Sequence, residues 1–298
     1  MSALFRVLRV LALIVVVGLV GLVLFVVIGS ERRLGQTYEV TVAPLTLPSD
    51  SAALARGKYL YESITCALCH AVDGGGAILD QDRWIGTMAG PNLTSGRGGV
   101  GALRTDEDFV RAIRRGVRHD GTSLIVMPSE VFTHLAESDL AALLAHIRRL
   151  PPVDREVPPT HFGPLGRALL AAGKLNILVA PKTPGVAAPA APPSAGTLEY
   201  GRYLADVSGC HGCHGHGLSG GRVAGPPGLP PASNLTPTGI GHWSEADFFR
   251  AMREGTRPDG SPLDEFMPWS EYRRLSDDGL RALWLYLRSV PPKAFGNK

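Results

Sequence analysis

Two kinds of hydrophobic pattern divide the chain. Residues 10–29 form an unbroken run of twenty uncharged residues, almost all of them Leu, Val, Ile or Phe. As a helix rising about 1.5 Å per residue, this run covers the roughly 30 Å hydrocarbon core of a bilayer. Further along, apolar residues instead recur at positions i, i+3, i+4 and i+7, which is typical of a helix with one buried face.

The long apolar run predicts an uncleaved transmembrane anchor over residues 1–30, followed by a stalk over 31–50. A cleaved signal peptide is the alternative, but its apolar region has about 7–15 residues and ends at a small-residue cleavage site. This run is longer, and residues 29–33 offer no such site. Arginines flank the run on both sides, so the positive-inside rule leaves the orientation open.

The helical pattern occurs twice, because the chain repeats itself at offsets of 139 to 144 residues. The recurring pieces are 57–60 with 201–204, 92–94 with 234–236, 105–109 with 244–248, 120–121 with 259–260, 127–128 with 267–268, and 151–152 with 291–292. We therefore predict two copies of one domain, residues 51–152 and 196–298. Residues 153–195 connect them, as a short apolar stretch followed by a Pro/Ala-rich spacer.

Each copy carries the same helix signals. Thr105 and Ser244 are good N-caps with an acidic residue three positions later, and Gly116 and Gly255 stand where a helix ends. The last helix of each copy has one apolar stripe, which predicts a buried face. The stripes are Leu140, Leu143, Leu144 and Ile147, and Leu280, Leu283, Trp284 and Leu287.

Composition and charge narrow the functional class. The 36 glycines, 24 prolines and 7% aromatic residues favour short helices joined by ordered loops. The net charge is +3, and each predicted domain is close to neutral. The chain therefore lacks the basic stripe of a nucleic-acid-binding protein.

All four cysteines fall into two C-x-x-C-H clusters, which are the attachment signature of c-type haem. In each cluster two thiols add to the vinyl groups of one porphyrin, and the adjacent histidine binds the iron as proximal ligand. The clusters predict two covalent haem c groups. Their residues are Cys66, Cys69 and His70, and Cys210, Cys213 and His214.

Zinc binding and dithiol chemistry are the alternatives for these clusters. A zinc site needs four ligands, and each copy would have to recruit two more from elsewhere. A thioredoxin-like dithiol expects a βαβ context and needs no histidine. Two clusters at matching places of a duplicated domain favour haem.

Met127 and Met267 are the candidates for the sixth iron ligand. Of the five methionines, only these two align between the copies, and both precede a proline. No histidine outside the clusters recurs in both copies, so we do not expect two histidines on both irons.

At this point the chain resembles the class I cytochrome c family. The order of C-x-x-C-H, Gly-Pro-Asn-Leu-Thr, Met-Pro and a final helix ending in Leu-Pro-Pro carries the likeness. The tandem arrangement is similar to the dihaem cytochrome c subunits of bacterial membrane-bound alcohol and related dehydrogenases. The resemblance implies a mainly α fold, with two tandem cytochrome c domains after an N-terminal transmembrane helix.

The resemblance also implies roles for the residues between the ligands. Pro91 would offer its carbonyl to the ring N–H of His70, and Leu93 and Leu235 would pack against the haems. The second copy has Ser233 where the first has Pro91, which puts that partner of His214 in doubt.

Histidine–methionine ligation leaves no open iron position, so we expect an electron carrier rather than an enzyme. The expected partners are a dehydrogenase, a quinol-oxidising complex or an oxidase. The resemblance implies that haem is attached on the periplasmic side of a bacterial membrane. We therefore expect a single-pass protein of the bacterial inner membrane with its haem domains in the periplasm. A cytochrome c subunit of a terminal oxidase and a dihaem peroxidase-like enzyme are the alternatives.

Overall fold

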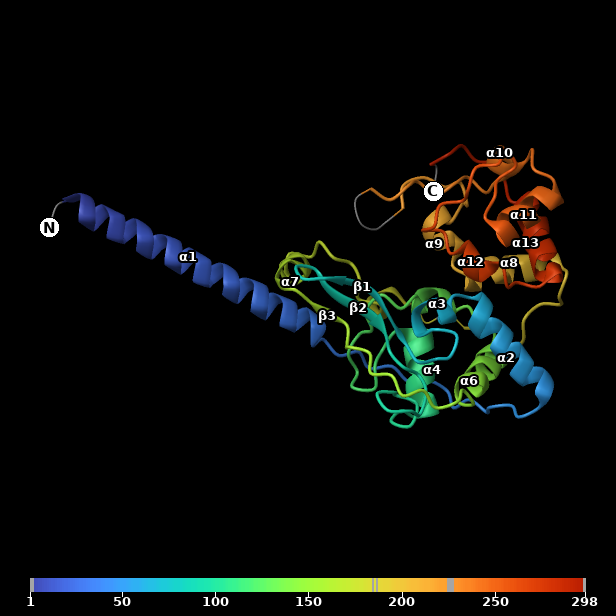
Figure 1. The fold of residues 1–298 in the computed structure, drawn as a ribbon, viewed down its shortest axis with the longest axis horizontal. Helices are drawn as coiled ribbons and strands as arrows, with labels where there is room; N and C mark the ends of the chain where they lie inside the picture. Colours follow the sequence, from blue (N-terminus) through green and yellow to red (C-terminus); the bar gives the residue numbers. More distant parts are fainter. Residues whose placement is uncertain (1–2, 184, 186, 224–227, 297–298) are drawn as a thin grey trace.

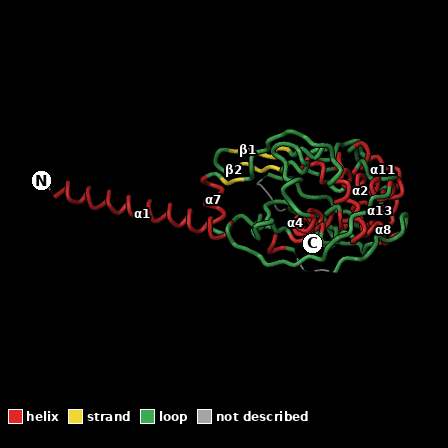
Figure 2. The backbone as a smooth tube through the Cα atoms, turned by 90° about the horizontal axis from the view of Figure 1, so that it is seen from below, coloured by secondary structure: helices red, strands yellow, loops and turns green. Residues whose placement is uncertain are grey.

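The computed structural model describes residues 3–183, 185, 187–223 and 228–296 (Figure 1). Its backbone is mostly helix and loop, with strands on one side only (Figure 2). The elements are α1 (Ala3–Leu34), α2 (Ser51–Ser63), α3 (Cys66–His70), β1 (Ala77–Asp82), β2 (Gly86–Gly90), α4 (Asp106–Arg115), α5 (Ser129–Phe132), α6 (Glu137–Ile147), β3 (His161–Phe162), α7 (Pro164–Ala171), a 3₁₀ turn η1 (Ala180–Lys182), α8 (Leu198–Val207), α9 (Cys210–His214), α10 (Pro237–Ile240), α11 (Glu245–Glu254), α12 (Trp269–Tyr272) and α13 (Asp277–Ser289).

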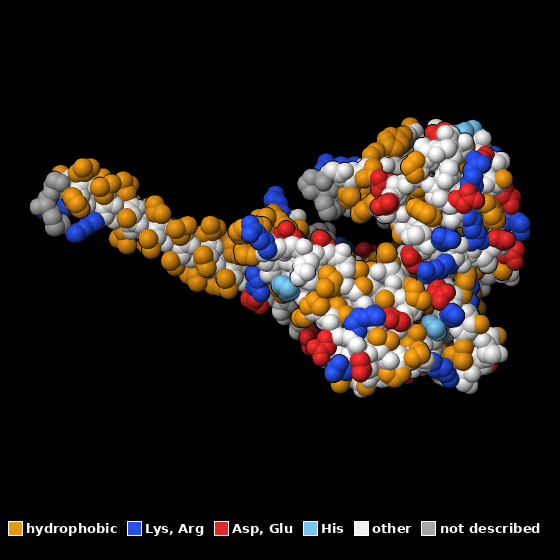
Figure 3. Space-filling view, viewed as in Figure 1, with side chains coloured by type: hydrophobic (Ala, Val, Ile, Leu, Met, Phe, Trp, Pro, Cys, Tyr) orange, Lys and Arg blue, Asp and Glu red, His pale blue; other side chains and the backbone are white. Residues whose placement is uncertain are grey.

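Helix α1 projects from the rest of the molecule and exposes its apolar side chains along its length (Figure 3). It continues to Leu34, four residues into the segment predicted as a stalk. Its most apolar window has a mean hydropathy of 3.4, and it is the one helix among the described residues long and apolar enough to cross a membrane.

The remaining chain repeats one order of helices. We call residues 51–152 the first repeat and residues 196–298 the second. Helices α2, α3, α4, α5 and α6 of the first correspond to α8, α9, α11, α12 and α13 of the second. The predicted caps are confirmed, because Thr105 and Ser244 each form a complete capping box. Gly116 and Gly255 end the same helices with φ of 61° and 67°.

The first and last helices of each repeat cross in close contact, which explains two equivalent glycines. A Cβ on Gly57 would lie 2.0 Å from the carbonyl oxygen of Ala142, and one on Gly201 would lie 1.9 Å from that of Ala282. Only glycine allows this approach of two backbones. The apolar stripes of α6 and α13 are buried beneath these crossings, as their spacing predicted.

A small antiparallel sheet in the order β1-β2-β3 is an addition to the mainly helical fold. Strands β1 and β2 form a hairpin in the first repeat, between the His70 cluster and Asn92. Strand β3 comes from the connecting segment, so that segment folds back onto the first repeat. Arg155 reinforces this return by pairing with Asp73.

The chain after α7 also packs in its described part, first at the end of the apolar stretch and then within the predicted Pro/Ala-rich spacer. Val179 is buried, and its backbone N–H donates to the Ser123 hydroxyl at 2.9 Å. Further on, the backbone N–H groups of Glu137 and Ser138, at the start of α6, donate to the carbonyls of Pro189 and Ala190. These carbonyls satisfy donors that a helix N-terminus leaves free, which composition could not indicate.

The two repeats pack against each other through equivalent elements. Helix α5 of the first contacts α8 of the second, and α12 of the second contacts α2 of the first. Tyr59 and Tyr203 are equivalent, and each hydroxyl accepts a backbone N–H at the start of the last helix of the other repeat. The donors are Ser276 at 3.3 Å and Ala136 at 3.1 Å. The arrangement is therefore close to two-fold symmetric.

Candidate functional site

The two C-x-x-C-H clusters form short helices in matching surroundings. Each follows a residue of left-handed conformation, Thr65 with φ 72° and Gly209 with φ 75°, which turns the chain sharply after the preceding helix. None of the four cysteines forms a disulfide. Burial, aided by the neighbouring Cys69, raises the pKa of Cys66 to about 12, and the pKa of Cys210 likewise rises to about 12, chiefly by burial.

The surroundings of the clusters bear on the zinc alternative, which needs four ligands at each site. Among the residues that the structure describes, no three His, Cys, Asp or Glu side chains group as a metal site would require. Two thiols beside one histidine, with a largely apolar lining, instead fit covalent haem attachment.

The last histidine of each cluster, the candidate iron ligand, lies within hydrogen-bond distance of a backbone carbonyl. Nδ1 of His70 lies 2.9 Å from the carbonyl oxygen of Pro91, and Nδ1 of His214 lies 2.7 Å from that of Ser233. A ring that donates from Nδ1 keeps Nε2 unprotonated as a metal ligand. Ser233 thus supplies the same contact to His214 that Pro91 supplies to His70. The contact is made by the main-chain carbonyl, which is present whether the residue is proline or serine.

Burial lowers the pKa of His70, while the hydrogen bond to Pro91 opposes that effect. The net result is a neutral imidazole near pH 7, which is the form that binds iron.

The two methionines are presented by the same local turn. In the first repeat the N–H of Ser129 donates to the Met127 carbonyl at 2.8 Å, and in the second the N–H of Trp269 donates to the Met267 carbonyl at 2.7 Å. Pro128 and Pro268 stand between them with φ and ψ near those of an inverse γ-turn. Because proline restricts φ there, the Met-Pro pair holds the methionine backbone in a fixed conformation and so limits where the thioether can lie.

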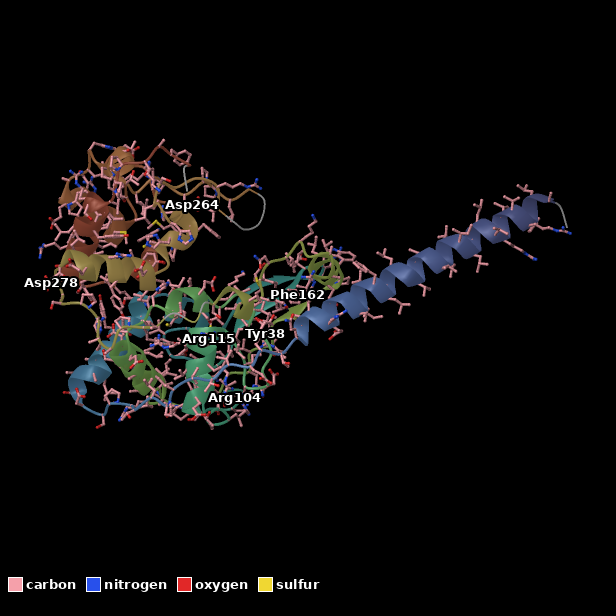
Figure 4. All side chains as sticks on the ribbon, turned by 180° about the vertical axis from the view of Figure 1, so that it is seen from behind. Tyr38, Arg104, Arg115, Phe162, Asp264 and Asp278 are labelled. Carbon is pink, nitrogen blue, oxygen red and sulfur yellow. The ribbon has the colours of Figure 1, made fainter. Side chains whose placement is uncertain are left out.

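In the second repeat, a largely apolar cavity of about 150 Å³ contains His214 and Met267 in its walls. Cys210, Cys213 and Leu235 line it as well. Asp264, labelled in Figure 4, lies on the loop that borders this cavity before Met267. The predicted attachment, ligand and packing residues are therefore brought to one space, and its apolar walls suit a porphyrin. In the first repeat, Leu93, Met127 and Cys66 are partly buried against the shared hydrophobic core.

The Asn-Leu-Thr motif has a positioning role that sequence reasoning left unassigned. The side-chain oxygen of Asn92 accepts from the N–H of Thr94 at 2.9 Å, and its Nδ2 donates to the Val153 carbonyl. Asn234 does the same with Thr236 and Lys293. The motif therefore ties the loop that carries Leu93 or Leu235 to the chain beyond the last helix.

A polar cluster between the repeats was also missed. Arg56 binds both carboxylate oxygens of Asp139, at 2.9 and 2.6 Å, and donates to the Tyr200 hydroxyl at 2.9 Å. Tyr203 donates to the same carboxylate at 2.7 Å. Burial raises the pKa of Tyr203, and the Asp139 carboxylate raises it further. The partners come from both repeats and lie far apart in the sequence, so no local motif predicts this cluster.

Comparison with known proteins agrees with this geometry. Residues 52–147 match the family model described as cytochrome C oxidase, cbb3-type, subunit III. The cytochrome c subunit of alcohol dehydrogenase (quinone) from Gluconobacter oxydans is 30% identical over 274 residues, covering 82% of this chain and 56% of that protein. The fructose dehydrogenase cytochrome subunit of Gluconobacter japonicus is 30% identical over 282 residues, covering 87% and 56%. The chain thus spans little more than half the length of these relatives.

A relative of similar length is the diheme cytochrome c-type protein of Cereibacter sphaeroides. It is 29% identical over 298 residues, which cover 89% of this chain and 95% of that protein. Together with the paired C-x-x-C-H clusters, these matches show that the chain is similar to c-type cytochromes and, among them, to the cytochrome c subunits of bacterial dehydrogenases.

Proposed function

We propose that the protein is a membrane-anchored dihaem cytochrome c that carries electrons from a periplasmic dehydrogenase. The observation that carries this proposal is the duplicated site, in which each repeat presents two thiols, a carbonyl-oriented histidine and a proline-mounted methionine. When bound, each haem supplies the one-electron iron couple on which the function depends.

The protein's own residues hold and enclose the two groups. Cys66 and Cys69 in the first repeat, and Cys210 and Cys213 in the second, provide the covalent attachment. His70 and Met127 would hold one iron, and His214 and Met267 would hold the other. A soft thioether favours ferrous iron, so this ligand pair raises the reduction potential.

The packing of the repeats supports electron transfer within the molecule. Gly209, directly before the second cluster, lies against Val131, four residues after Met127; a Cβ on Gly209 would be 3.3 Å from the Val131 side chain. The start of one attachment helix thus contacts the methionine segment of the other repeat. The polar cluster of Arg56, Asp139 and Tyr203 fixes this relative orientation.

Helix α1 supports membrane anchoring, and the need for haem attachment supports a periplasmic location of the repeats at the bacterial inner membrane. A tether of this kind raises the effective concentration of the haems near membrane partners. Several relatives are named as subunits of dehydrogenases for alcohol, fructose or gluconate, which supports a dehydrogenase as the electron donor.

A terminal-oxidase cytochrome subunit is the second candidate, because the family model that matches residues 52–147 is described by an oxidase subunit. A peroxidase-like enzyme would need an open or weakly bound iron, and a methionine in both repeats argues against it.

Purification of the tagged holoprotein from detergent-solubilised native membranes tests the proposal. We expect a dehydrogenase to co-purify, and we expect that dehydrogenase's substrate to reduce both haems. Co-purification with oxidase subunits would favour the second candidate, and a high-spin haem with peroxidase activity would contradict both.

A further inference from the structure

The end of the β1–β2 hairpin carries an apolar surface that no other described element covers. We call Trp84, Ile85 and Leu165 the hairpin patch; their exposed fractions are 52%, 36% and 47%. Arg83 lies beside the patch, with its guanidinium 4.9 Å from the centre of the Trp84 ring. An exposed tryptophan beside an arginine is the combination that proteins place at membrane–water interfaces.

The patch is a rigid surface rather than a loose loop. The N–H groups of Trp84 and Ile85 both donate to one carboxylate oxygen of Asp82 at 2.7 Å. The carbonyl of Trp84 accepts the N–H of Leu165, the second residue of α7, at 2.9 Å. The two parts of the patch are therefore joined by main-chain hydrogen bonds, so presenting them together costs little conformational entropy.

Helix α7 fixes the patch at a definite level along α1. A Cβ on Gly29 would lie 3.1 Å from the Ala171 side chain, so the two helices meet at small residues. Arg167 of α7 bonds to Ser30 and Glu31 of α1. Figure 1 shows α7 and the sheet beside the C-terminal turns of α1. Because the apolar run ends at Gly29, this is the level at which a spanning helix leaves the hydrocarbon.

The charges around the patch suit an anionic lipid surface. The basic groups of this region are Arg32, Arg33, Arg83 and Lys174. Of the acidic groups nearby, Glu31 is paired with Arg167, and Asp82 keeps its negative charge beside Arg83, because the backbone N–H groups of Ile85 and Trp84 lower its pKa. The basic groups outnumber these acidic ones, and basic groups close to an anionic leaflet favour binding to it.

We propose that the hairpin patch docks into the headgroup region of the same bilayer that α1 crosses. The docking rests on the proposed anchoring by α1. It gives the first repeat a second membrane contact and so holds the paired repeats in one orientation above the bilayer. The second repeat follows the orientation of the first through the interface between them, in which α5 contacts α8 and α12 contacts α2.

Lipid photo-crosslinking of the full-length holoprotein tests this docking. The protein is reconstituted in phosphatidylcholine–phosphatidylglycerol vesicles that contain a lipid with a photoreactive group near the headgroup, and the adducts are located by peptide mass spectrometry. Trp84→Glu is the test variant. Leu103→Glu is the matched control, because Leu103 is 69% exposed and its neighbour Arg104 lies away from α1 in Figure 4.

We expect adducts in α1 and in peptides that contain residues 83–85 and 164–166. Trp84→Glu should abolish the second set and retain the first, while Leu103→Glu should retain both. Adducts in α1 without any in the hairpin would overturn the docking and leave the anchor standing. Absence of adducts from both segments would overturn the anchor, and the docking with it.

Discussion

The two repeats hold their candidate ligands in the same way but differ around them. In both repeats a main-chain carbonyl orients the histidine, and the methionine begins an inverse γ-turn centred on proline. Nearby positions have diverged, with Pro91 against Ser233, Asp139 against Gly279, and His146 against Tyr286. The comparison indicates that backbone geometry positions the candidate ligands, so the side chains around them can differ between the two repeats.

The interface shows the same division. Tyr59 and Tyr203 make equivalent hydrogen bonds across the pseudo-two-fold axis. Arg56 and Tyr200 are equivalent positions that now bond to each other, and Asp139 has only Gly279 as its counterpart. The interface therefore combines a symmetric pair of hydrogen bonds with one asymmetric charged cluster. Both charged residues of that cluster, Arg56 and Asp139, belong to the first repeat.

Replacing one methionine at a time should have the largest effect. We expect Met127→His and Met267→His each to lower the reduction potential of one haem, by roughly 0.1–0.3 V within the ~0.8 V range that axial ligands span. A potentiometric titration followed by absorbance should show one midpoint displaced and the other retained. Met88→Leu is the control, since Met88 lies in strand β2 and does not line the cavity that contains His214 and Met267. Midpoints that do not move in either histidine variant would show that these methionines are not ligands.

Breaking the charged cluster should come next. Asp139 is 2% exposed, and Asp139→Asn weakens its pairing with Arg56 and Tyr203. We expect the free energy of unfolding to fall by about 2 kcal/mol, since the guanidinium is left with a neutral partner in a mostly buried place. Chemical denaturation of the holoprotein measures this. Asp278→Asn, at an exposed pair on α13, should change stability by less than about 0.5 kcal/mol. Equal effects of the two variants would show that the cluster does not stabilise the interface.

Exchanging the residue that supplies the carbonyl should matter little. We expect Pro91→Ser to leave the ferric spectrum and the haem content unchanged, because the second repeat achieves the same bond with Ser233 at 2.7 Å. The NMR signal of the His70 ring N–H, which the hydrogen bond protects from exchange with solvent, checks the bond directly. Loss of that bond in the variant would mean that proline itself, and not the carbonyl, holds the ring.

The smallest effect should be a difference in acid sensitivity. Burial lowers the pKa of His146 below its ordinary 6.5, and the charge of Glu62 opposes that effect. The unfolded chain therefore binds this proton more readily, so the stabilising contribution of the neutral ring is present above pH 6.5 and is lost as the pH falls through the lowered pKa. We expect His146→Tyr, which copies Tyr286, to flatten the loss of stability between about pH 7 and pH 5. A slope identical to that of the parent protein would contradict this role.

The helices and the candidate ligands could be predicted from sequence because their signals are local. Capping residues at Thr105 and Ser244, the apolar stripes of α6 and α13, and the repeated Met-Pro pairs each lie within one short segment. The β1–β2 hairpin and the return of residues 153–182 were not predicted, since pairing with a distant strand leaves no periodic pattern in either partner. The Arg56–Asp139 bond joins residues 83 apart, and only packing of the whole chain reveals it.

Intact-mass measurement of the purified chain tests most directly the claim that each repeat binds one haem covalently. We predict the mass of the chain plus two haems for the parent protein, and plus one haem for each double variant, Cys66→Ala with Cys69→Ala, or Cys210→Ala with Cys213→Ala. A parent chain that carries one haem or none, or a double variant that retains two, would contradict it.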